Sequence, residues 1–292
     1  MARVAFIGLG NMGGGMAANL AKHGHDVRAY DLSAEALARA EGAGCLAAES
    51  AAAAVDGAEA VFTMLPAGRH VAQVYDEILP LVDAAATLID CSTIDVATAR
   101  AVAEQARTRG VAAVDSPVSG GIAAATAGTL TFMVGGPAEA FERARPFLEL
   151  MGKAVIHAGA SGTGQAAKLC NNLILGATMI ATCEGFVLAE RLGLDPQVFY
   201  DIASKATAQS WSMTSYCPVP GVGPTSPADN DYRGGFAGAL MLKDLELAMA
   251  AATDGGATLP LGGHARDLYR AFGEGGHGGE DFSGIIRMLR GA

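Results

Sequence analysis

The sequence has little charge for a protein of its size. Only 17% of its 292 residues are charged, whereas 51% are apolar. An average soluble protein carries about 25% charged residues, so this chain has ample material for a large core and too little charge for a disordered chain. A chain of this length is expected to form two domains, or one large domain with an extension.

Basic residues are also scarce. Twenty Lys and Arg stand against thirty Asp and Glu, which gives a net charge of −10. This charge opposes approach to the phosphates of nucleic acid and to anionic lipid, so we expect no nucleic acid and no membrane as partners. Because only five of the basic residues are lysines, each lysine is worth examining; they are Lys22, Lys153, Lys168, Lys205 and Lys243.

Long hydrophobic runs are missing. The longest strongly apolar stretch, Leu173–Cys183, has eleven residues, and a membrane span needs about 20. Val4–Ile7 already has the character of a core strand, which leaves no room for a signal or transit peptide ahead of the fold. We therefore expect a soluble, cytoplasmic protein.

The residue patterns of metal sites and of the commonest hydrolases are absent. The five cysteines include no C-x-x-C pair, and the six histidines include no H-x-x-x-H pair. We therefore expect neither a disulfide framework nor a metal site. No G-x-S-x-G motif occurs, which removes the usual nucleophile elbow.

The first half of the chain alternates short apolar runs with Ala-rich helical stretches. This alternation predicts an α/β fold with a doubly wound parallel sheet. The expected strands are Val4–Ile7, Val27–Tyr30, Ala60–Leu65, Thr87–Asp90, Ala112–Asp115, Leu130–Val134 and Ala154–His157. The helical stretches between them include Met16–His23, Ser33–Glu41 and Ala97–Arg109.

The second half has a different pattern. After Gly159 no further strand is expected, and a long helical run from about Gly164 to Leu192 begins. Further helices are predicted at Pro196–Lys205, Gly235–Asp254, Leu261–Gly273 and Phe282–Leu289, with loops at Tyr216–Gly234 and Gly273–Gly279. We expect a sheet domain over residues 1–163 and an all-α domain over residues 164–292.

The first strand runs directly into a G-x-G-x-x-G motif, Gly8-Leu9-Gly10-Asn11-Met12-Gly13, followed by a helix. Its glycines permit a tight turn, close approach of the backbone to a pyrophosphate, and close helix packing. Asp31 closes the second strand, where a carboxylate accepts hydrogen bonds from ribose hydroxyls and repels a 2′-phosphate. The motif predicts a dinucleotide site that favours NAD over NADP. The alternative interpretation is that Asp31 caps the helix that begins near Ser33. Capping and ribose binding are compatible.

Two further segments carry candidate substrate residues. Residues 116–121, Ser-Pro-Val-Ser-Gly-Gly, follow a strand end; their exposed N–H groups suit a carboxylate, although a plain Pro/Gly turn fits the spacing as well. Lys168 and Asn172 are four residues apart and share one helical face. A lysine in a closed, partly apolar site can accept and return a proton. The alternative interpretation is that Lys168 is a solvated lysine on the surface of the helix.

The same two interpretations apply to Lys243-Asp244, which lies in another apolar helix. Trp211, the single tryptophan, is expected to pack in the core, with the wall of a substrate pocket as the alternative.

Taken in order, these motifs resemble those of the β-hydroxyacid dehydrogenase family. The matching segments are Gly8–Gly13, Met64-Leu65-Pro66, Asp90–Ile94, Ser116–Gly121, Gly164–Asn172, Gly235-Phe236 and Lys243-Asp244-Leu245. The resemblance covers essentially the whole chain. It implies a Rossmann-type domain followed by an all-α domain, an active site in the cleft between them, and a homodimer or homotetramer. One departure is Gly15, where relatives often carry proline, so we expect a looser helix start.

The resemblance also implies roles for individual residues. Leu65, Pro66 and Thr93 would line the NAD site beside the glycine loop, and Ser119, Gly120 and Gly121 would hold the substrate carboxylate. Lys168 would be the catalytic acid/base and Asn172 would orient the substrate. Lys243 would contact the cofactor or the substrate, and Trp211, Phe236 and Asp244 complete the expected substrate site.

The implied reaction is oxidation of a small 3-hydroxy carboxylic acid by hydride transfer to NAD. For 3-hydroxyisobutyrate the product is methylmalonate semialdehyde, a step of valine breakdown. Two alternatives stay open: a reductase for tartronate semialdehyde or for glyoxylate and succinic semialdehyde, and a non-catalytic NAD-binding regulator.

Overall fold

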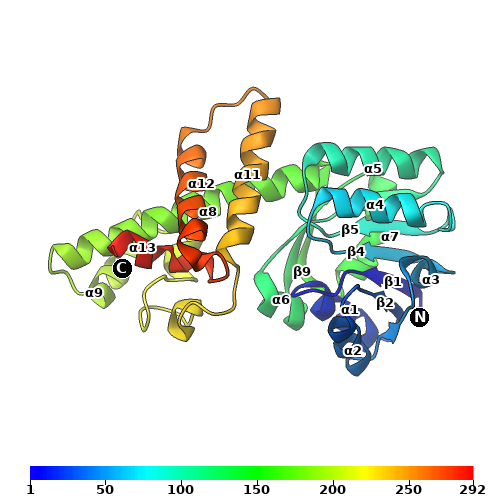
Figure 1. Ribbon diagram of the computed structural model, residues 1–292, viewed down its shortest axis with the longest axis horizontal. Helices are drawn as coiled ribbons and strands as arrows, with labels where there is room; N and C mark the ends of the chain where they lie inside the picture. The colour runs from blue at the N-terminus through cyan, green and yellow to red at the C-terminus, as the bar shows by residue number, and fades with distance from the viewer. Residues whose placement is uncertain (292) are drawn as a thin grey trace. The chain divides into compact units, whose positions relative to one another are not determined.

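The computed structural model describes residues 1–291 and divides into two compact units. The first unit is Met1–Lys168, and the second runs from Leu169 to the C-terminus. All strands of the sheet lie in the first unit, and the described part of the second unit is helical (Figure 1).

The sheet has the strand order β3-β2-β1-β4-β5-β6-β8-β7, with β9 paired to β8. Its strands are β1 (Arg3–Ile7), β2 (Asp26–Tyr30), β3 (Leu46–Ala47), β4 (Ala60–Thr63), β5 (Thr87–Asp90), β6 (Ala112–Asp115), β7 (Val118–Ser119), β8 (Leu130–Gly135) and β9 (Gly152–Gly159). From β3 to β6 all pairs are parallel, in the order of a dinucleotide-binding fold. The predicted α/β fold is confirmed.

One edge of the sheet departs from the prediction. β8 runs antiparallel to both β6 and β7, because the chain reverses after β7, where α6 and the turn that follows it lead back into β8. The strands β3 and β7 were not predicted, since two residues are too few to give a recognisable alternation of side chains.

Helices cover both faces of the sheet. One face packs against α1 (Gly13–Lys22), α2 (Ala34–Gly42), α6 (Gly121–Ala127) and α7 (Ala138–Leu148); the other packs against α3 (Ala51–Val55), α4 (Gly68–Ile78) and α5 (Val96–Thr108). Side chains alternate along β1, where Val4 and Phe6 enter one core and Ala5 and Ile7 enter the other. Figure 1 shows α4 and α5 side by side on their face. Four of these helices, α3, α4, α6 and α7, were not predicted.

Helix α1 begins at Gly13, three residues before the predicted start. Gly15 is closely packed: a Cβ there would lie 3.1 Å from the backbone nitrogen of Thr126. The Asn19 side chain, one turn further on, donates to the carbonyl of Ala125 at 2.8 Å. The glycine therefore makes room for α6, and we find this tight packing where we expected a loose helix start.

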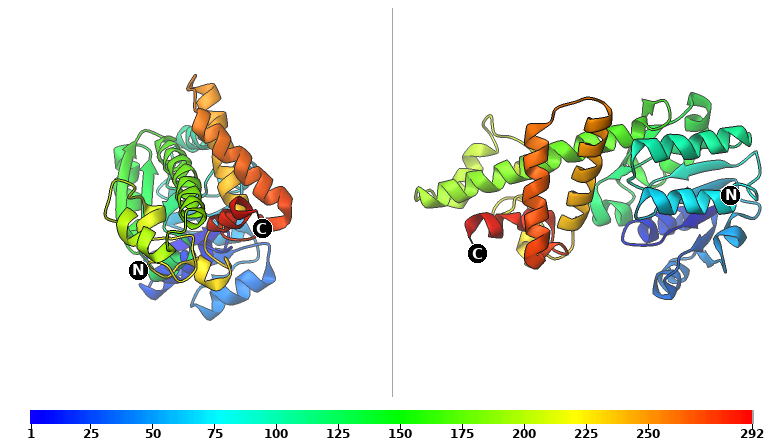
Figure 2. Two further views of the ribbon diagram at one scale, coloured as in Figure 1. Left: turned by 90° about the vertical axis from the view of Figure 1, so that its left-hand side faces the viewer. Right: turned by 45° about the horizontal axis from the view of Figure 1, so that its top comes forward.

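The second unit packs around the long helix α8. Its elements are α8 (Thr163–Arg191, which begins in the first unit), α9 (Pro196–Ala203), α10 (Trp211–Thr214), η1 (Pro227–Asn230), α11 (Gly238–Asp254), α12 (Pro260–Phe272), η2 (Gly273–His277), η3 (Phe282–Gly284) and α13 (Ile285–Arg290). Figures 1 and 2 show α11 and α12 as neighbours. The core holds Met179, Phe186, Met241, Leu245 and Tyr269.

Two local predictions in this unit need correction. The segment predicted as a loop at Gly273–Gly279 contains the π-helical turn η2, which is kinked at Gly276 with φ of 91°. The helix expected from Gly235 begins at Gly238, so Phe236 lies in the segment that precedes it.

Helix α8 is long and apolar enough to cross a membrane, by length and composition alone. The predicted apolar run of eleven residues covered only its middle. About 44% of its most apolar window is buried inside the protein, and Glu184 lies exposed on the same helix. The core helix of a soluble protein has the same properties, so this is weak evidence for a membrane.

Candidate functional site

The glycine loop has the geometry of a phosphate-binding turn. A Cβ at Gly8, where φ is +97°, would lie against the carbonyl of Met64, and one at Gly13 would collide with the carbonyl of Gly8. At Gly10 a Cβ would meet nothing within 4 Å. Packing therefore requires the first and third glycines, while the second leaves backbone open on the exposed side, as a bound pyrophosphate needs. Asn11 is exposed and Met12 half-buried in the same turn.

Asp31 lies beside this loop and is fixed to it. Its Oδ2 accepts from the N–H of Leu9 at 2.6 Å, and its Oδ1 accepts from the N–H of Ser33 at 2.8 Å. The cap of α2 is the hydroxyl of Ser33, which accepts from Ala36. Since a carboxylate accepts further hydrogen bonds, Asp31 fits the hydroxyls of a ribose bound along the loop.

The loops after β4 and β5 are joined through one serine. The Leu65 N–H donates to Ser92 Oγ at 2.8 Å, and this hydroxyl donates to Asp90 Oδ1 at 2.6 Å. Thr63 donates to the same carboxylate oxygen at 2.8 Å. The structure thus brings the exposed Pro66 and the half-buried Thr93 to the same edge of the sheet as the glycine loop and Asp31.

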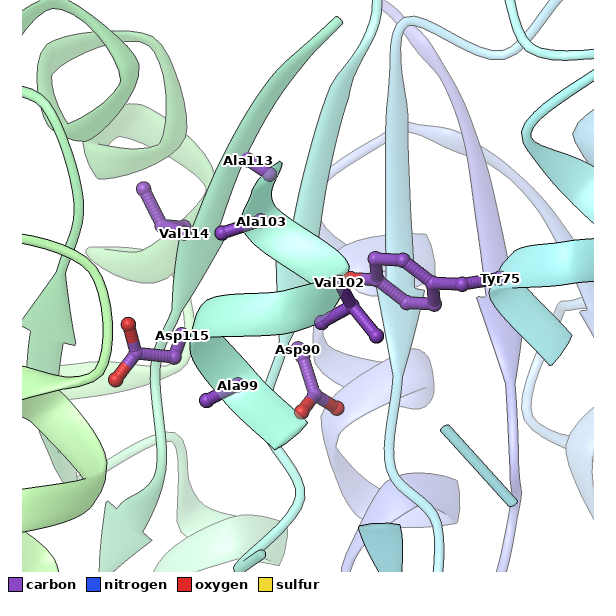
Figure 3. Close-up of a pocket in the computed structure, with 8 residues that line it drawn as sticks. All are labelled: Tyr75, Asp90, Ala99, Val102, Ala103, Ala113, Val114 and Asp115. Atoms are coloured by element: carbon purple, nitrogen blue, oxygen red, sulfur yellow. The ribbon is translucent and has the colours of Figure 1, made fainter. Parts of the chain in front are cut away.

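Asp90 itself is completely enclosed. Figure 3 shows it near Tyr75 and Asp115, around a cavity of about 10 Å³ that has room for one water. Its Oδ2 has no hydrogen-bond partner among the described residues. Burial raises the pKa of Asp90 to about 6, against the hydrogen bonds from Ser92 and Thr63, and the charge of Asp115 adds slightly to the rise.

Asp115 and Gln165 fix the start of α8. Asp115 accepts from the N–H groups of Gly162 at 2.6 Å and Gln165 at 2.9 Å. It therefore caps backbone N–H groups that have no acceptor within the helix. The fully buried Gln165 side chain accepts from Ile94 N–H at 3.1 Å and donates to the Ser92 carbonyl at 2.7 Å. The first turn of α8 is therefore bonded to the loop that carries Thr93.

Lys168 lies one turn after this anchor and is 7% exposed. It is therefore a buried lysine rather than the solvated surface lysine of the alternative interpretation. The anchoring residues Asp115 and Gln165 were missed from the sequence, because they are 50 residues apart and meet the loop after β5 only in the fold.

The turn at Ser119, Gly120 and Gly121 has two glycines with positive φ, of 136° and 72°. A Cβ at Gly120 would lie 2.6 Å from the Cβ of Ala124, whereas one at Gly121 would meet nothing within 4 Å. The backbone conformation alone accounts for both glycines, which supports the plain turn. The expected carboxylate contact stays a prediction.

In the second unit a polar group joins α8 and α11. Asn172 donates through Nδ2 to Asp244 Oδ2 at 2.6 Å, and both residues are buried, at 1% and 2% exposure. Lys243 Nζ lies 3.5 Å from Asp244 Oδ1. The helices approach closely at Gly176, where a Cβ would lie 3.1 Å from the sulfur of Met241. Three predicted residues, Asn172, Lys243 and Asp244, are thus brought together.

An aromatic cluster contains the other two predicted substrate residues. Trp211 is half exposed and stacks on Tyr216 with ring centroids 4.6 Å apart, so the core position expected for it is wrong. Tyr216 and Phe236 both pack against Phe282, at 5.6 and 5.9 Å. Tyr216 was missed, because it lies beyond the end of α10 in a segment with no regular periodicity.

Two family models match the chain. The NAD binding domain of 6-phosphogluconate dehydrogenase matches residues 3–159. The model described as the NAD-binding domain of NADP-dependent 3-hydroxyisobutyrate dehydrogenase matches residues 162–289.

Relatives match over the full length. 3-Hydroxyisobutyrate dehydrogenase of Pseudomonas aeruginosa is 49% identical over 100% of this chain and 99% of that protein. The NAD-dependent L-serine dehydrogenase of the same organism is 45% identical over 99% of this chain and 98% of that protein. A solved structure of Mycobacterium tuberculosis 3-hydroxyisobutyrate dehydrogenase with L-serine has a TM-score of 0.95 and 49% identity, covering 99% of both chains.

Proposed function

Because this chain belongs to the 3-hydroxyisobutyrate dehydrogenase family of NAD-dependent oxidoreductases, we propose that it oxidises 3-hydroxyisobutyrate to methylmalonate semialdehyde in valine breakdown. The observation that carries the proposal is the anchor of Gln165 on the loop around Thr93. It ties the turn of α8 before Lys168 to the strand ends that carry the cofactor residues.

The residues of the first unit fit NAD. Gly8–Gly13 would hold its pyrophosphate, Asp31 its ribose hydroxyls, and Leu65, Pro66 and Thr93 the nicotinamide half. Bound NAD supplies the hydride acceptor, and the protein supplies binding and orientation. Asp31 faces a 2′-phosphate with like charge, which supports a preference for NAD over NADP.

Lys168 takes the hydroxyl proton of the substrate in this proposal. An amine can accept and return a proton at working pH, which a guanidinium cannot. Asn172 orients the substrate hydroxyl through its amide, and Asp244 holds that amide in place. Lys243 adds a positive charge near the cofactor or the substrate, next to Asp244.

The substrate itself would be held at two ends. Its carboxylate binds the N–H groups of Ser119, Gly120 and Gly121, and its apolar side faces Trp211 and Phe236. Ser119 ends β7, and small residues at the carboxyl end of a strand suit an anion, which supports this assignment.

L-Serine is a second candidate substrate. One relative is named for L-serine oxidation, and one solved relative contains L-serine. The two acids share the hydroxymethyl group and the carboxylate, and they differ at the middle carbon, which bears a methyl group in one and an ammonium group in the other. The wall formed by Trp211 and Phe236 suits the methyl group.

A panel of acids with NAD tests the substrate assignment. We expect 3-hydroxyisobutyrate to give the highest kcat/KM, L-serine a lower value, and the methyl ester of 3-hydroxyisobutyrate little or none. Removal of a methyl group from an apolar pocket is worth only about 1–3 kcal/mol, so loss of the carboxylate should cost more than loss of the branch. Equal activity on acid and ester would overturn the anion site. Faster reduction of tartronate, glyoxylate or succinic semialdehyde would favour the reductase alternatives, and no turnover would favour the regulator.

The assembly we propose is a homodimer or homotetramer. Exposed apolar side chains follow one side of α8 and continue on α9: Ile174, Leu188, Leu192, Val198 and Ile202 are 47–76% exposed. A patch of this kind on a helix pair marks an interaction surface. A second copy suits it better than lipid, since the exposed Glu184 lies on the same helix. Sedimentation tests the subunit number, and cell fractionation tests the expected cytoplasmic location.

A further inference from the structure

A buried carboxylate at Asp281 joins both ends of the segment that carries the proposed aromatic wall. Its Oδ2 accepts from the hydroxyl of Tyr216 at 2.8 Å and from the N–H of Phe236 at 2.7 Å. Its Oδ1 accepts from the N–H and the hydroxyl of Ser283, at 3.0 and 2.6 Å. Asp281 is fully buried, and these four hydrogen bonds use both oxygens.

The backbone makes the same connection. The Asp281 N–H donates to the Tyr232 carbonyl, and the Phe282 N–H donates to the Phe236 carbonyl, each at 2.8 Å. An isolated β-bridge pairs Ala237 with Asp281. The segment before α11 is therefore held in register against residues 281–282.

Tyr216 connects Asp281 to Trp211 through one hydrogen bond and one ring contact. Its hydroxyl is tied to Asp281, while its ring lies under the half-exposed indole of Trp211, with an interplanar angle of 23°. Gly235 packs closely against the hydrogen bond between Asp281 and Tyr216. Its φ is +68°, and a Cβ there would collide with the carboxylate of Asp281 and the hydroxyl of Tyr216.

We propose that Asp281 is a positioning residue for substrate recognition, which sets the orientation of Trp211 through Tyr216 and the place of Phe236 through its backbone N–H. The proposal rests on the proposed function in that the acid contacts Trp211 and Phe236. Asp281 acts on the wall, and the cofactor residues of the first unit have no part in it.

Kinetics of Asp281→Asn and Tyr216→Phe test the proposal. An aspartate has four acceptor positions on two oxygens, whereas an asparagine keeps one oxygen, so one pair of donors loses its acceptor. We expect KM for the hydroxy acid to rise about two- to tenfold, the worth of one aromatic pair, with KM for NAD unchanged. The double variant should show little more than Asp281→Asn alone, because Tyr216→Phe removes a connection that Asp281→Asn has already weakened. Unchanged KM for the acid in both variants, or equal rises in both KM values, would overturn the proposal.

Two neighbouring glycines give a matched control. Gly235→Ala introduces a Cβ against Asp281 and Tyr216, whereas Gly234→Ala introduces one into open space at a similar positive φ of +86°. We expect Gly235→Ala to raise KM for the acid and Gly234→Ala to leave it near the wild-type value. Equal effects of the two substitutions would mean that backbone strain alone is responsible, and would overturn the proposal.

A readout independent of catalysis separates this proposal from the proposed function. Trp211 is the only tryptophan, so intrinsic fluorescence reports on it alone. Loosening of its stack on Tyr216 should increase quenching by acrylamide in Asp281→Asn relative to the wild type and to Ser283→Ala. Increased quenching in a protein that oxidises no hydroxy acid would refute the proposed function and leave the positioning of Trp211 standing. Identical quenching in all three proteins would refute the positioning.

Discussion

The two units hold their candidate site residues in different ways. In the first unit, strand ends and glycines place the proposed cofactor residues, and backbone groups make key links, such as the N–H of Leu9 to Asp31. In the second unit, buried carboxylates reach across to other elements: Asp244 holds Asn172, 72 residues away, and Asp281 holds Tyr216, 65 residues away. The glycine loop and Asp31 follow from spacing along one strand, turn and strand, whereas the contacts of Asp244 and Asp281, like that of Asp115 with Gln165 in the first unit, depend on the finished fold.

The largest expected effect belongs to Lys168, where the chain passes from the first unit to the second. General acid/base catalysis contributes about 10²–10⁴-fold, so Lys168→Ala should lower kcat by at least the bottom of that range while NADH affinity changes little. Steady-state rates and an NADH titration measure both quantities. Lys168→Arg should not restore kcat, because a guanidinium keeps its proton.

Lys243→Ala is the matched comparison, since Lys243 is proposed to contribute contact and charge. We expect a mixed rise in KM for cofactor and acid from it. If kcat of Lys168→Ala stays within about threefold of wild type across the pH range, the acid/base role moves to another residue.

Asp90 gives the next effect, on stability in the first unit. Its pKa is about 6 in the fold against 3.8 for an ordinary aspartate. The raised pKa means that its contribution is fully present below pH 3.8 and is lost as pH rises through 6. From pH 4 to 7 the wild type should therefore lose up to about 3 kcal/mol of unfolding free energy relative to Asp90→Asn.

Denaturant unfolding at several pH values measures this difference. Asp115 and Tyr75, the titratable neighbours of Asp90, are present in both proteins, so the measured difference reports Asp90 together with its coupling to these two groups. A constant difference between wild type and Asp90→Asn across this range would show that Asp90 is already charged at the low end.

Asp244 tests the carboxylate support of the second unit. A hydrogen bond to a charged group is worth about 1.5–3 kcal/mol, so Asp244→Ala should lower kcat/KM for the acid about 10- to 150-fold. Asp244→Asn keeps one acceptor for Asn172 and should restore part of the loss. Glu246→Ala, which breaks an exposed ion pair with Arg270 on α12, is the control and should have little effect. Equal losses in Glu246→Ala and Asp244→Ala would contradict the specific support.

The smallest effects separate two glycines of one loop. Gly13→Ala should lower the free energy of unfolding by about 1–3 kcal/mol, because its Cβ meets the Gly8 carbonyl. Gly10→Ala should leave the melting temperature unchanged, since its Cβ meets no protein atom within 4 Å. The same Cβ would enter the space proposed for the pyrophosphate, so NADH binding should weaken on the order of tenfold. Melting curves and NADH titrations of both variants decide the matter. Wild-type NADH affinity in Gly10→Ala would place the pyrophosphate elsewhere.

More of the candidate site residues could be predicted from the sequence in the first unit than in the second. The glycine loop and Asp31 could be predicted because their spacing along a strand, a turn and a second strand is itself the signal. Lys168 was singled out because a lysine in an apolar helix is unusual, while its acid/base role came from the family resemblance and stays a prediction. Asp115 and Gln165 could not be predicted, since their roles arise where two strand ends meet the start of α8.

In the second unit the polar partners were the difficult part. Asp244 was included through its neighbour Lys243, but its bond to Asn172 depends on the close approach of α8 and α11 at Gly176. Tyr216 and Asp281 lie in segments with no regular periodicity, so no pattern in the sequence indicates that they meet. Helices α3, α4, α6 and α7 were not named among the helical stretches, although α4 and α7 have a clear amphipathic pattern that was available as a signal.

The most direct test of the account is the cofactor and substrate choice of the unaltered protein. With 3-hydroxyisobutyrate as substrate, kcat/KM is measured for NAD and for NADP by following the absorbance of the reduced nicotinamide. We predict a higher kcat/KM with NAD, because the carboxylate of Asp31, held by the N–H of Leu9, accepts from the ribose and repels a 2′-phosphate. A higher kcat/KM with NADP, or no reduced cofactor from any 3-hydroxy acid, would contradict it.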